Sequence, residues 1–384
     1  MLKTLSINEL YQWAVEQRRH LHMNPELSGK EFNTCSFIKQ ALQTFKIDIL
    51  DIQEPSVVGF IKGKAGGKTI ALRADIDALP IPEEGEKVYK SKVHGVSHAC
   101  GHDGHTAILL SVARWLSEHR EELKHNVALI FQSSEEMIPS GAEILVKQGI
   151  MDEVDAVFGL HLFQTIEKGK IGINHGPIMS AADDFNIRIQ GKGGHGAMPQ
   201  DSVDPTYIAS HVIQALQSII GRRMPAAEPA VISIGRMEAG SALNVIPDTA
   251  TLSGTIRTVS QETRTFVSNE MNKLVEGICT AFGGSGTVEF GWGAPPVVND
   301  KEMSELVERA ILHNFGQEAI CYVEPNMGSE DFSFYLEEKK GAYFFIGMGG
   351  EHSQYPHHHP KFDIDEETIP TAIDMFLEII KQFE

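Results

Sequence analysis

Apolar segments of strand length alternate with amphipathic segments along this chain, and that alternation restricts the fold to the α/β class. TIALRAD (69–75) and NVALIFQ (126–132) are apolar enough to be strands buried on both faces. Between them, from Thr106 to His119, apolar residues recur at helical spacing. Because helices that connect strands in this way bring the strands into parallel pairing, we expect a mixed, mostly parallel sheet flanked by helices.

Polar side chains that can bind metal ions follow three of the predicted strands. They are Asp75, Asp77, Glu135, Glu136 and His161, the last of which lies one residue before the end of the segment DAVFGLHL (155–162). In an open α/β sheet, ligands bind in the crevice beyond the carboxyl ends of the strands. The sequence therefore predicts a ligand site at this edge of the sheet.

The pattern changes near Ala181, where apolar and polar residues begin to alternate as they do in strands with one exposed face. Such strands are expected at 184–195, 230–240, 248–258 and 286–293, and helices at 205–220 and 261–282. We interpret residues 181–291 as an inserted α+β domain with a four-stranded sheet and two helices. Residues 1–180 and 292–384 then form the main domain, with further helices at 300–315 and 365–383.

Length and composition exclude several classes of protein. The 384 residues suffice for two domains, and 42% hydrophobic with 22% charged residues is typical of a soluble globular protein. A formal net charge of −19 excludes nucleic acid as a partner, because polyphosphate would be repelled. No apolar run approaches the roughly 20 residues that cross a bilayer, and the amino terminus lacks a signal-peptide pattern. The four scattered cysteines favour reduced thiols and a cytoplasmic location away from membranes.

The stretch HACGHDGH (98–105) places three histidines, a cysteine and an aspartate in eight positions. Cys100 and His102 stand just before the predicted helix, so their side chains can converge at its amino end. Thiolate and imidazole groups are ligands of first-row transition metals. Three further candidate ligands come from distant segments: His161, one carboxylate of the pair Glu135–Glu136, and His358.

Five candidate ligands are more than the four of a closed structural zinc site, so they fit a pair of metal ions better. One thiolate and one carboxylate supply a charge of −2 against the +4 of two divalent ions. The residual positive charge can acidify a bound water and attract an anionic substrate.

The adjacent carboxylates of Glu135 and Glu136 predict two different roles. Successive residues that leave a strand point in different directions, so both rarely bind the same ion. One can therefore bind metal while the other stands beside the water as a general base. Burial and mutual repulsion raise the proton affinity of the free carboxylate, which suits proton transfer near neutral pH.

With these residues assembled, the chain resembles the two-domain metal-dependent amidohydrolases. They include hippurate hydrolases, N-acyl-amino-acid deacylases, auxin-conjugate hydrolases and N-acetyldiaminopimelate deacetylases, and are related to the co-catalytic zinc carboxypeptidases. The resemblance extends nearly from one end of the chain to the other. The motifs that carry it are RRHLHMNPELSGKE (18–31), ALRADIDALPI (71–81), HACGHDGHTA (98–107), FQSSEE (131–136), GLH (159–161), GKGGHGAMP (191–199), SALNVIPD (241–248), SGTIRT (253–258), GSEDF (328–332) and HHPKFD (358–363).

The resemblance implies a role for each matching residue. The five metal ligands would be Cys100, His102, Glu136, His161 and His358, with Glu135 as the general base. His195 resembles a histidine that reaches the active site of a partner subunit and stabilises the oxyanion, which implies a homodimer formed through the inserted domain. Asn244 and Arg257 are candidates for holding the carboxylate of the substrate when the domains close. Asp77 and Asp103 are expected to orient metal ligands through hydrogen bonds.

The domains take their roles from the same resemblance. Residues 1–180 and 292–384 would be the catalytic di-metal domain, and residues 181–291 a lid and dimerisation domain. The implied activity is hydrolysis of the amide bond in a small N-acyl amino acid, with water activated by two divalent ions per subunit (Zn, Mn, Co or Ni) and by Glu135. Two departures from the family pattern concern substrate preference: Ser133–Ser134 stand where Pro-Ala is common, and His357 where Leu is usual.

Other functions stay open at this point. The same chemistry on small unacylated peptides would make the protein a dipeptidase or a carboxypeptidase, and N-acetyldiaminopimelate is a further possible substrate. A hydrolase with Cys100 as its nucleophile would retain activity after chelation of metals. A noncatalytic binding protein on the same fold is a further alternative, although every expected ligand and the base are present.

Overall fold

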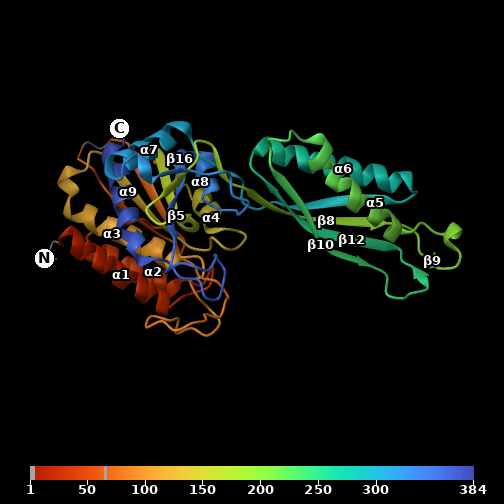
Figure 1. Cartoon of the computed structure of the whole chain (residues 1–384), viewed down its shortest axis with the longest axis horizontal. Coiled ribbons are helices and arrows are strands. Elements are labelled where there is room, and N and C mark those ends of the chain that lie inside the picture. The colour runs from red at the N-terminus through yellow and green to blue at the C-terminus, as the bar shows by residue number, and fades with distance from the viewer. Residues whose placement is uncertain (1–4, 65–66) are drawn as a thin grey trace. The chain divides into compact units, whose positions relative to one another are not determined.

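The computed structural model describes residues 5–64 and 67–384, which fall into two compact units (Figure 1). The first comprises the described residues of Met1–Ile178 together with Val298–Glu324 and Asp331–Glu384, and the second comprises Met179–Val297 and Pro325–Glu330. The expected insertion, 181–291, lacks the short segment Pro325–Glu330. This segment belongs to the second unit because its backbone carbonyls accept hydrogen bonds from Ser180, including one of 3.0 Å from the Ser180 amide to Asn326.

The first unit is built on an eight-stranded sheet with the strand order β1-β2-β4-β3-β5-β16-β6-β15. The central strands β4, β3, β5 and β16 are parallel to one another, whereas β1, β2 and β6 introduce antiparallel pairs. This confirms the predicted mixed, mostly parallel sheet. The strands are β1 Asp48–Ile49, β2 Val57–Ile61, β3 Thr69–Asp75, β4 Asn126–Gln132, β5 Ala156–Glu167, β6 Ile171–Ile173, β15 Ile320–Tyr322 and β16 Lys340–Gly349.

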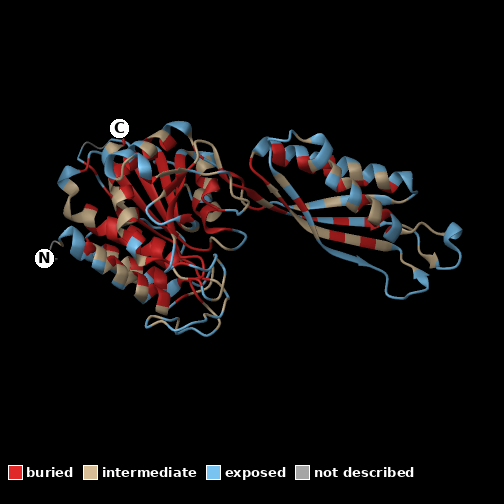
Figure 2. Cartoon of the chain, viewed as in Figure 1, coloured by how far each residue is buried: buried red, intermediate tan, exposed pale blue. Residues whose placement is uncertain are grey.

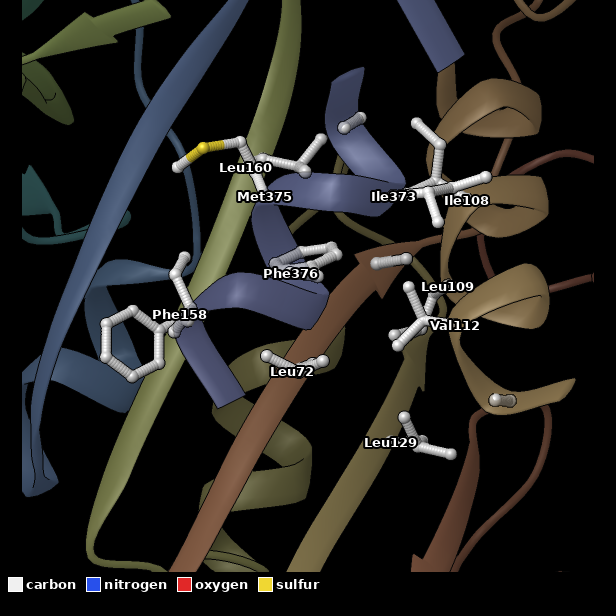
Figure 3. Packing of buried hydrophobic residues seen from close by; sticks show 14 of the residues in the cluster. Leu72, Ile108, Leu109, Val112, Leu129, Phe158, Leu160, Ile373, Met375 and Phe376 are labelled. Carbon is white, nitrogen blue, oxygen red and sulfur yellow. The ribbon is translucent and has the colours of Figure 1, made fainter. Parts of the chain in front are cut away.

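The core of this unit lies between the sheet and the helices α3 (His102–Glu118) and α9 (Ile369–Gln382). Leu72 and Phe158 of the sheet, Ile108 of α3 and Phe376 of α9 all belong to this buried cluster (Figure 3). The central strands are buried on both faces, as Figure 2 shows, which explains why their sequences are continuously apolar. The other helices of the unit are α1 Ile7–Met23, α2 Phe32–Thr44, α4 Gly141–Lys147, α7 Lys301–Asn314 and α8 Ser333–Glu338.

Helix α3 begins four residues earlier than the apolar periodicity predicts. The residue before it, Gly101, has φ +90°, a left-handed conformation that glycine adopts without steric cost. The chain therefore turns sharply after Cys100 and enters the helix at His102, so that His102 is the first helical residue rather than part of a preceding loop. Both side chains stay at the amino end of the helix.

The second unit has a four-stranded antiparallel sheet with the order β10-β12-β8-β13. Its strands are β8 Ala181–Gln190, β10 Ala230–Ala239, β12 Thr249–Thr258 and β13 Ser285–Gly291. Two helices, α5 Pro205–Ser218 and α6 Gln261–Ala281, bury the apolar face of the sheet, while the alternate side chains of β8 are exposed. A short ribbon pairs β9 (Gly194–His195) with β11 (Val245–Ile246).

Across both units, none of the helices in 5–64 and 67–384 combines the length and the apolar character that a membrane span requires.

Candidate active site

The side chain of His102 is fixed in one orientation at the start of α3. Its Nδ1 atom lies 3.0 Å from the backbone oxygen of Asp77 and 3.1 Å from Oδ1 of the same residue. Because both partners can only accept, Nδ1 carries a proton and donates, and Nε2 is the ring nitrogen that can bind a metal ion. That Nε2 atom is buried and has no hydrogen-bond partner among the described residues.

His161 presents its ring in the same way. Its Nδ1 atom donates to the backbone oxygen of Leu162 at 2.9 Å, which leaves Nε2 unprotonated. That Nε2 lies 3.5 Å from Sγ of Cys100. The sulfur of Cys100 and ring nitrogens of His102 and His161 all lie within 4.8 Å of one another, and all three residues are buried. Contrary to expectation, His161 lies in the middle of β5, because this strand continues to Glu167 alongside β16.

Glu136 and His358 lie in loops and add two further candidate ligands to the cluster. Nε2 of His358 lies 3.0 Å from Oε1 of Glu136, and ligand atoms of both residues lie within 4.8 Å of Cys100 Sγ and of one another. The backbone of His358 has φ +64°, which is uncommon for a residue with a side chain. Glu135 lies next to Glu136 in the turn after β4, and oxygens of both carboxylates lie within 4.8 Å of a ring nitrogen of His102.

Asp77 connects two of these residues. Besides His102, it accepts a hydrogen bond from the backbone amide of Glu136, at 3.1 Å to Oδ2, and one from Ser28 Oγ, at 2.7 Å. These contacts agree with the expected orienting role of Asp77. Asp103 differs, since its side chain bonds to Arg18 and His22 and not to a candidate ligand.

The donor set fits divalent transition-metal ions. Two buried imidazoles lie beside one thiol, and Nε2 of His102 is a buried polar atom without a hydrogen-bond partner among the described residues, which a metal ion would satisfy. Metal-binding histidines characteristically donate their other ring nitrogen to a carboxylate or a carbonyl, as both of these do.

The charges in the cluster depend strongly on each other. Burial and the nearby His105 and His357 hold the pKa of His161 well below its usual range, which keeps its ring neutral. Burial and Glu136 raise the pKa of the Cys100 thiol, whereas hydrogen bonds to Cys100 and Glu136 raise the pKa of His358 to about 10. A cation bound between these groups would replace the protons of the thiol and of His358.

His105 belongs to this site although the sequence analysis assigned it no role. Its Nδ1 donates to Asp75 Oδ1 at 2.6 Å, and its Nε2 accepts from the amide of Leu162 at 3.0 Å, directly after His161. It therefore holds the segment that carries His161. The sequence signal was its position three residues after His102, which places both on one side of α3.

The remaining predicted site residues lie in the second unit, and the cluster described above lies wholly in the first. His195 is exposed on β9, where its Nδ1 accepts from the amide of Ala197 at 3.1 Å. Asn244 is its neighbour, because the amide of Gly196 donates to the carbonyl of Asn244 at 2.9 Å. The second unit thus brings His195 and Asn244 together.

Arg257 is separated from that pair. It lies near the carboxyl end of β12, whereas the residue before the strand, Asp248, accepts a hydrogen bond from the Gly193 amide close to His195. Eight residues of extended strand between them span about 26 Å. The Arg257 side chain bonds to Thr255 Oγ1 and, at 3.0 Å, to the carbonyl of Ile256.

The chain is similar to known proteins over nearly its whole length. The sequence model of peptidase family M20/M25/M40 matches residues 71–382 of this chain. The chain is 40% identical over 369 residues to an N-acetylcysteine deacetylase of Bacillus subtilis, covering 95% of each chain. It is 38% identical over 369 residues to thermostable carboxypeptidase 2 of Saccharolobus solfataricus, covering 94% of this chain and 93% of that one. The crystal structure of the Bacillus subtilis YXEP protein, described as a dinuclear metal-binding peptidase of the M20 family, superposes with a TM-score of 0.87 at 36% identity, over 97% of this chain and 98% of that chain.

Proposed function

The chain belongs to peptidase family M20/M25/M40, a family of hydrolases that cleave C–N bonds, and we propose that it removes the acyl group from small N-acyl amino acids. The observation that carries this proposal is the convergence of Cys100, His102 and His161 within 4.8 Å, with Glu135 and Glu136 beside them. The similarity to an N-acetylcysteine deacetylase along nearly the whole chain supports the substrate class.

Cys100, His102, Glu136, His161 and His358 would hold two divalent metal ions in the first unit. The similarity to a dinuclear metal-binding peptidase supports the number of ions. When bound, such ions act as Lewis acids, lower the pKa of water and stabilise negative charge that develops on a carbonyl oxygen. The ligand types suit Zn, Co or Ni, and Mn is a further candidate.

Glu135 is the proposed general base. Its carboxylate accepts a proton from water as the water oxygen attacks the acyl carbonyl carbon. The same proton then passes to the amide nitrogen as the C–N bond breaks, so that the products are a carboxylic acid and a free amino acid. Glu135 suits this role because its carboxylate lies within 4.8 Å of a ring nitrogen of His102, beside the proposed ligands.

We further propose that His195 and Asn244 act on the active site of a second copy of the chain, in a homodimer formed through the second unit. His195 lies in the ribbon of β9 and β11, Asn244 directly precedes β11, and both residues are exposed. The His195 ring can donate a hydrogen bond from Nε2 because Nδ1 accepts one. A donor of this kind stabilises the oxyanion of the tetrahedral intermediate. Arg257 lies near the carboxyl end of β12, away from His195 and Asn244, so its proposed contact with the substrate carboxylate does not depend on those two residues.

A carboxypeptidase is the second candidate function, and the similarity to thermostable carboxypeptidase 2 favours it. The two candidates share the chemistry and differ in the group that precedes the scissile amide. A panel that pairs N-acetyl amino acids with dipeptides of the same carboxyl-terminal residue separates them.

The proposal is tested by removing metals with a chelator and assaying hydrolysis of this panel before and after adding Zn²⁺, Mn²⁺, Co²⁺ or Ni²⁺. We expect activity on N-acyl amino acids to be lost on chelation and restored by at least one ion. Activity that survives complete metal removal would instead support a hydrolase with Cys100 as its nucleophile. Faster cleavage of the dipeptides would favour the carboxypeptidase.

A further inference from the structure

The motif RRHLH (18–22) on α1 has no part in the proposed chemistry, yet it contains a fully buried arginine. The Arg18 side chain has 0% exposure. Its guanidinium donates from Nε to Asp103 at 2.8 Å, from Nη2 to Asp363 at 2.5 Å and from Nη1 to Glu366 at 3.1 Å. One side chain thus binds three carboxylates that come from two distant segments.

Both of those segments carry proposed metal ligands. Asp103 follows His102 directly in the first turn of α3, and Asp363 follows His358 by five residues in the carboxyl-terminal loop. We propose that Arg18 is a positioning residue that holds these two ligand-bearing segments in the register needed for metal binding. This inference rests on the proposed function, because the metal ligands are assigned there.

The surroundings of Arg18 favour this role over simple stabilisation. Buried ion pairs lose solvation on folding, so on average they add little net stability compared with apolar side chains of the same size. The loop that Arg18 binds includes His358, whose φ of +64° persists only where the surrounding structure enforces it. Arg18 contributes such enforcement through Asp363, which also accepts a hydrogen bond from Tyr89 at 2.9 Å.

His22, one helical turn after Arg18, extends the network. Its Nδ1 lies 2.7 Å from Asp103 Oδ2, and its Nε2 lies 2.8 Å from Glu83. Asp103 therefore binds two residues of α1 at once, which attaches the first turn of α3 to that helix. The planar fork of arginine is needed to reach Asp103 and Asp363 together, because the single ammonium of lysine is a point donor.

Two variants test the inference, Arg18→Lys and the milder Asp363→Asn. Each has a matched control that alters a contact of α1 away from the ligand segments. Arg114→Lys changes an arginine that lies over the Trp13 ring of α1 and pairs with Glu118, near the far end of α3. Asp374→Asn removes the carboxylate that accepts from Tyr11 at 2.7 Å.

The measurements are Co²⁺ binding to metal-free protein, followed by visible absorption and by calorimetry, and thermal unfolding of the same metal-free samples. We expect Arg18→Lys and Asp363→Asn to bind Co²⁺ about 10–100-fold more weakly, the size of effect typical of residues that support metal ligands. The absorption bands of the bound ion should also shift, because the ligand geometry changes. The control variants should bind Co²⁺ as the unchanged protein does, even where they unfold at lower temperature.

Unchanged Co²⁺ affinity and unchanged spectra in Asp363→Asn would overturn the inference, and so would equal losses in the controls. Asp363→Asn decides the matter if Arg18→Lys does not fold. If the unchanged protein binds no Co²⁺, the proposed function itself fails, and this inference fails with it. If the unchanged protein binds the ions while Asp363→Asn binds them equally well, only the role of Arg18 is refuted.

Discussion

The backbone amide of His358 donates a hydrogen bond to the carbonyl oxygen of Ala99 at 2.8 Å. The last proposed ligand in the sequence is thereby attached to the residue that precedes the first one, Cys100. Because this contact joins backbones, it does not depend on either side chain at these two positions. Substitutions of nearby residues should therefore change the orientation of individual ligand side chains more than the distance between the two backbone segments.

Replacing Glu135 by Gln should separate metal binding from turnover. The amide cannot accept a proton from water, so we expect kcat to fall by roughly 10²–10⁴-fold, while metal affinity stays within a few-fold of normal. Steady-state kinetics and calorimetric metal titration measure the two quantities. Glu143→Gln, at a partly exposed position on α4, serves as the control and should leave both unchanged. Normal turnover in Glu135→Gln would refute the assignment of the base.

Replacing Asp77 by Asn should weaken metal binding. The carboxylate of Asp77 accepts from His102, Ser28 and the amide of Glu136, and an asparagine offers one accepting oxygen in place of two. We expect metal affinity to decrease about 10–100-fold, measured by competition with a chelator of known affinity. The exposed Asp48 provides the control substitution, Asp48→Asn, which should have no effect.

Replacing Gly101 by Ala should destabilise the first unit and disturb the cluster. The left-handed φ costs a residue with a side chain about 1–2 kcal/mol, and the added Cβ would lie 3.2 Å from Cγ2 of Ile364. Gly95 is a matched control, because its φ is +73° and an added Cβ meets no atom within 4 Å. Urea unfolding should therefore show a larger loss for Gly101→Ala than for Gly95→Ala. Equal losses would mean that the Ile364 side chain moves away from the added Cβ without a cost in stability.

The stability of the protein should respond to acid through Glu83. The Glu83 side chain is 3% exposed, and although burial alone would raise its pKa, hydrogen bonds from His22, the Ser91 amide and Lys87 lower it to about 2. A carboxyl with a lowered folded pKa adds stability above its unfolded pKa of about 4.5, and this stability is lost as the pH falls toward 2. The full effect is at most about 3 kcal/mol at neutral pH.

Glu83→Gln should accordingly be less stable than the unchanged protein at pH 7, and the difference should shrink between pH 4.5 and pH 2. Urea unfolding at a series of pH values measures it. Glu84→Gln, at an exposed neighbouring position, should show a constant difference near zero. If the free energy of unfolding of Glu83→Gln differs from that of the unchanged protein by the same amount at every pH, the expected ionisation of this side chain is contradicted.

The strands of the main sheet could be predicted closely because burial on both faces leaves a continuous apolar signature. TIALRAD coincides with β3 and NVALIFQ with β4. The start of α3 could not be placed in this way, since the polar first turn, from His102 to His105, carries no apolar periodicity. The start of the helix is set by Gly101, and the left-handed conformation of this residue is visible only in the structure.

The candidate site shows a similar division. Residue type and neighbouring motifs indicated Cys100, His102 and His358, because thiol and imidazole groups are recognisable as metal ligands in any context. The burial of Arg18 could not be predicted, since an arginine on an amphipathic helix is usually solvated. Its partners Asp103 and Asp363 come from segments whose proximity depends on the packing of α1 against α3.

The composition of the second unit from two pieces of chain has a practical consequence for anyone who wishes to produce it alone. A gene fragment that ends at Val297 would omit the strip 325–330. The Ser180 amide and hydroxyl would then lose the carbonyls of Asn326, Met327 and Gly328 that accept from them. Such a fragment should be joined by a short linker to residues 325–330, or else expressed together with a peptide of that sequence.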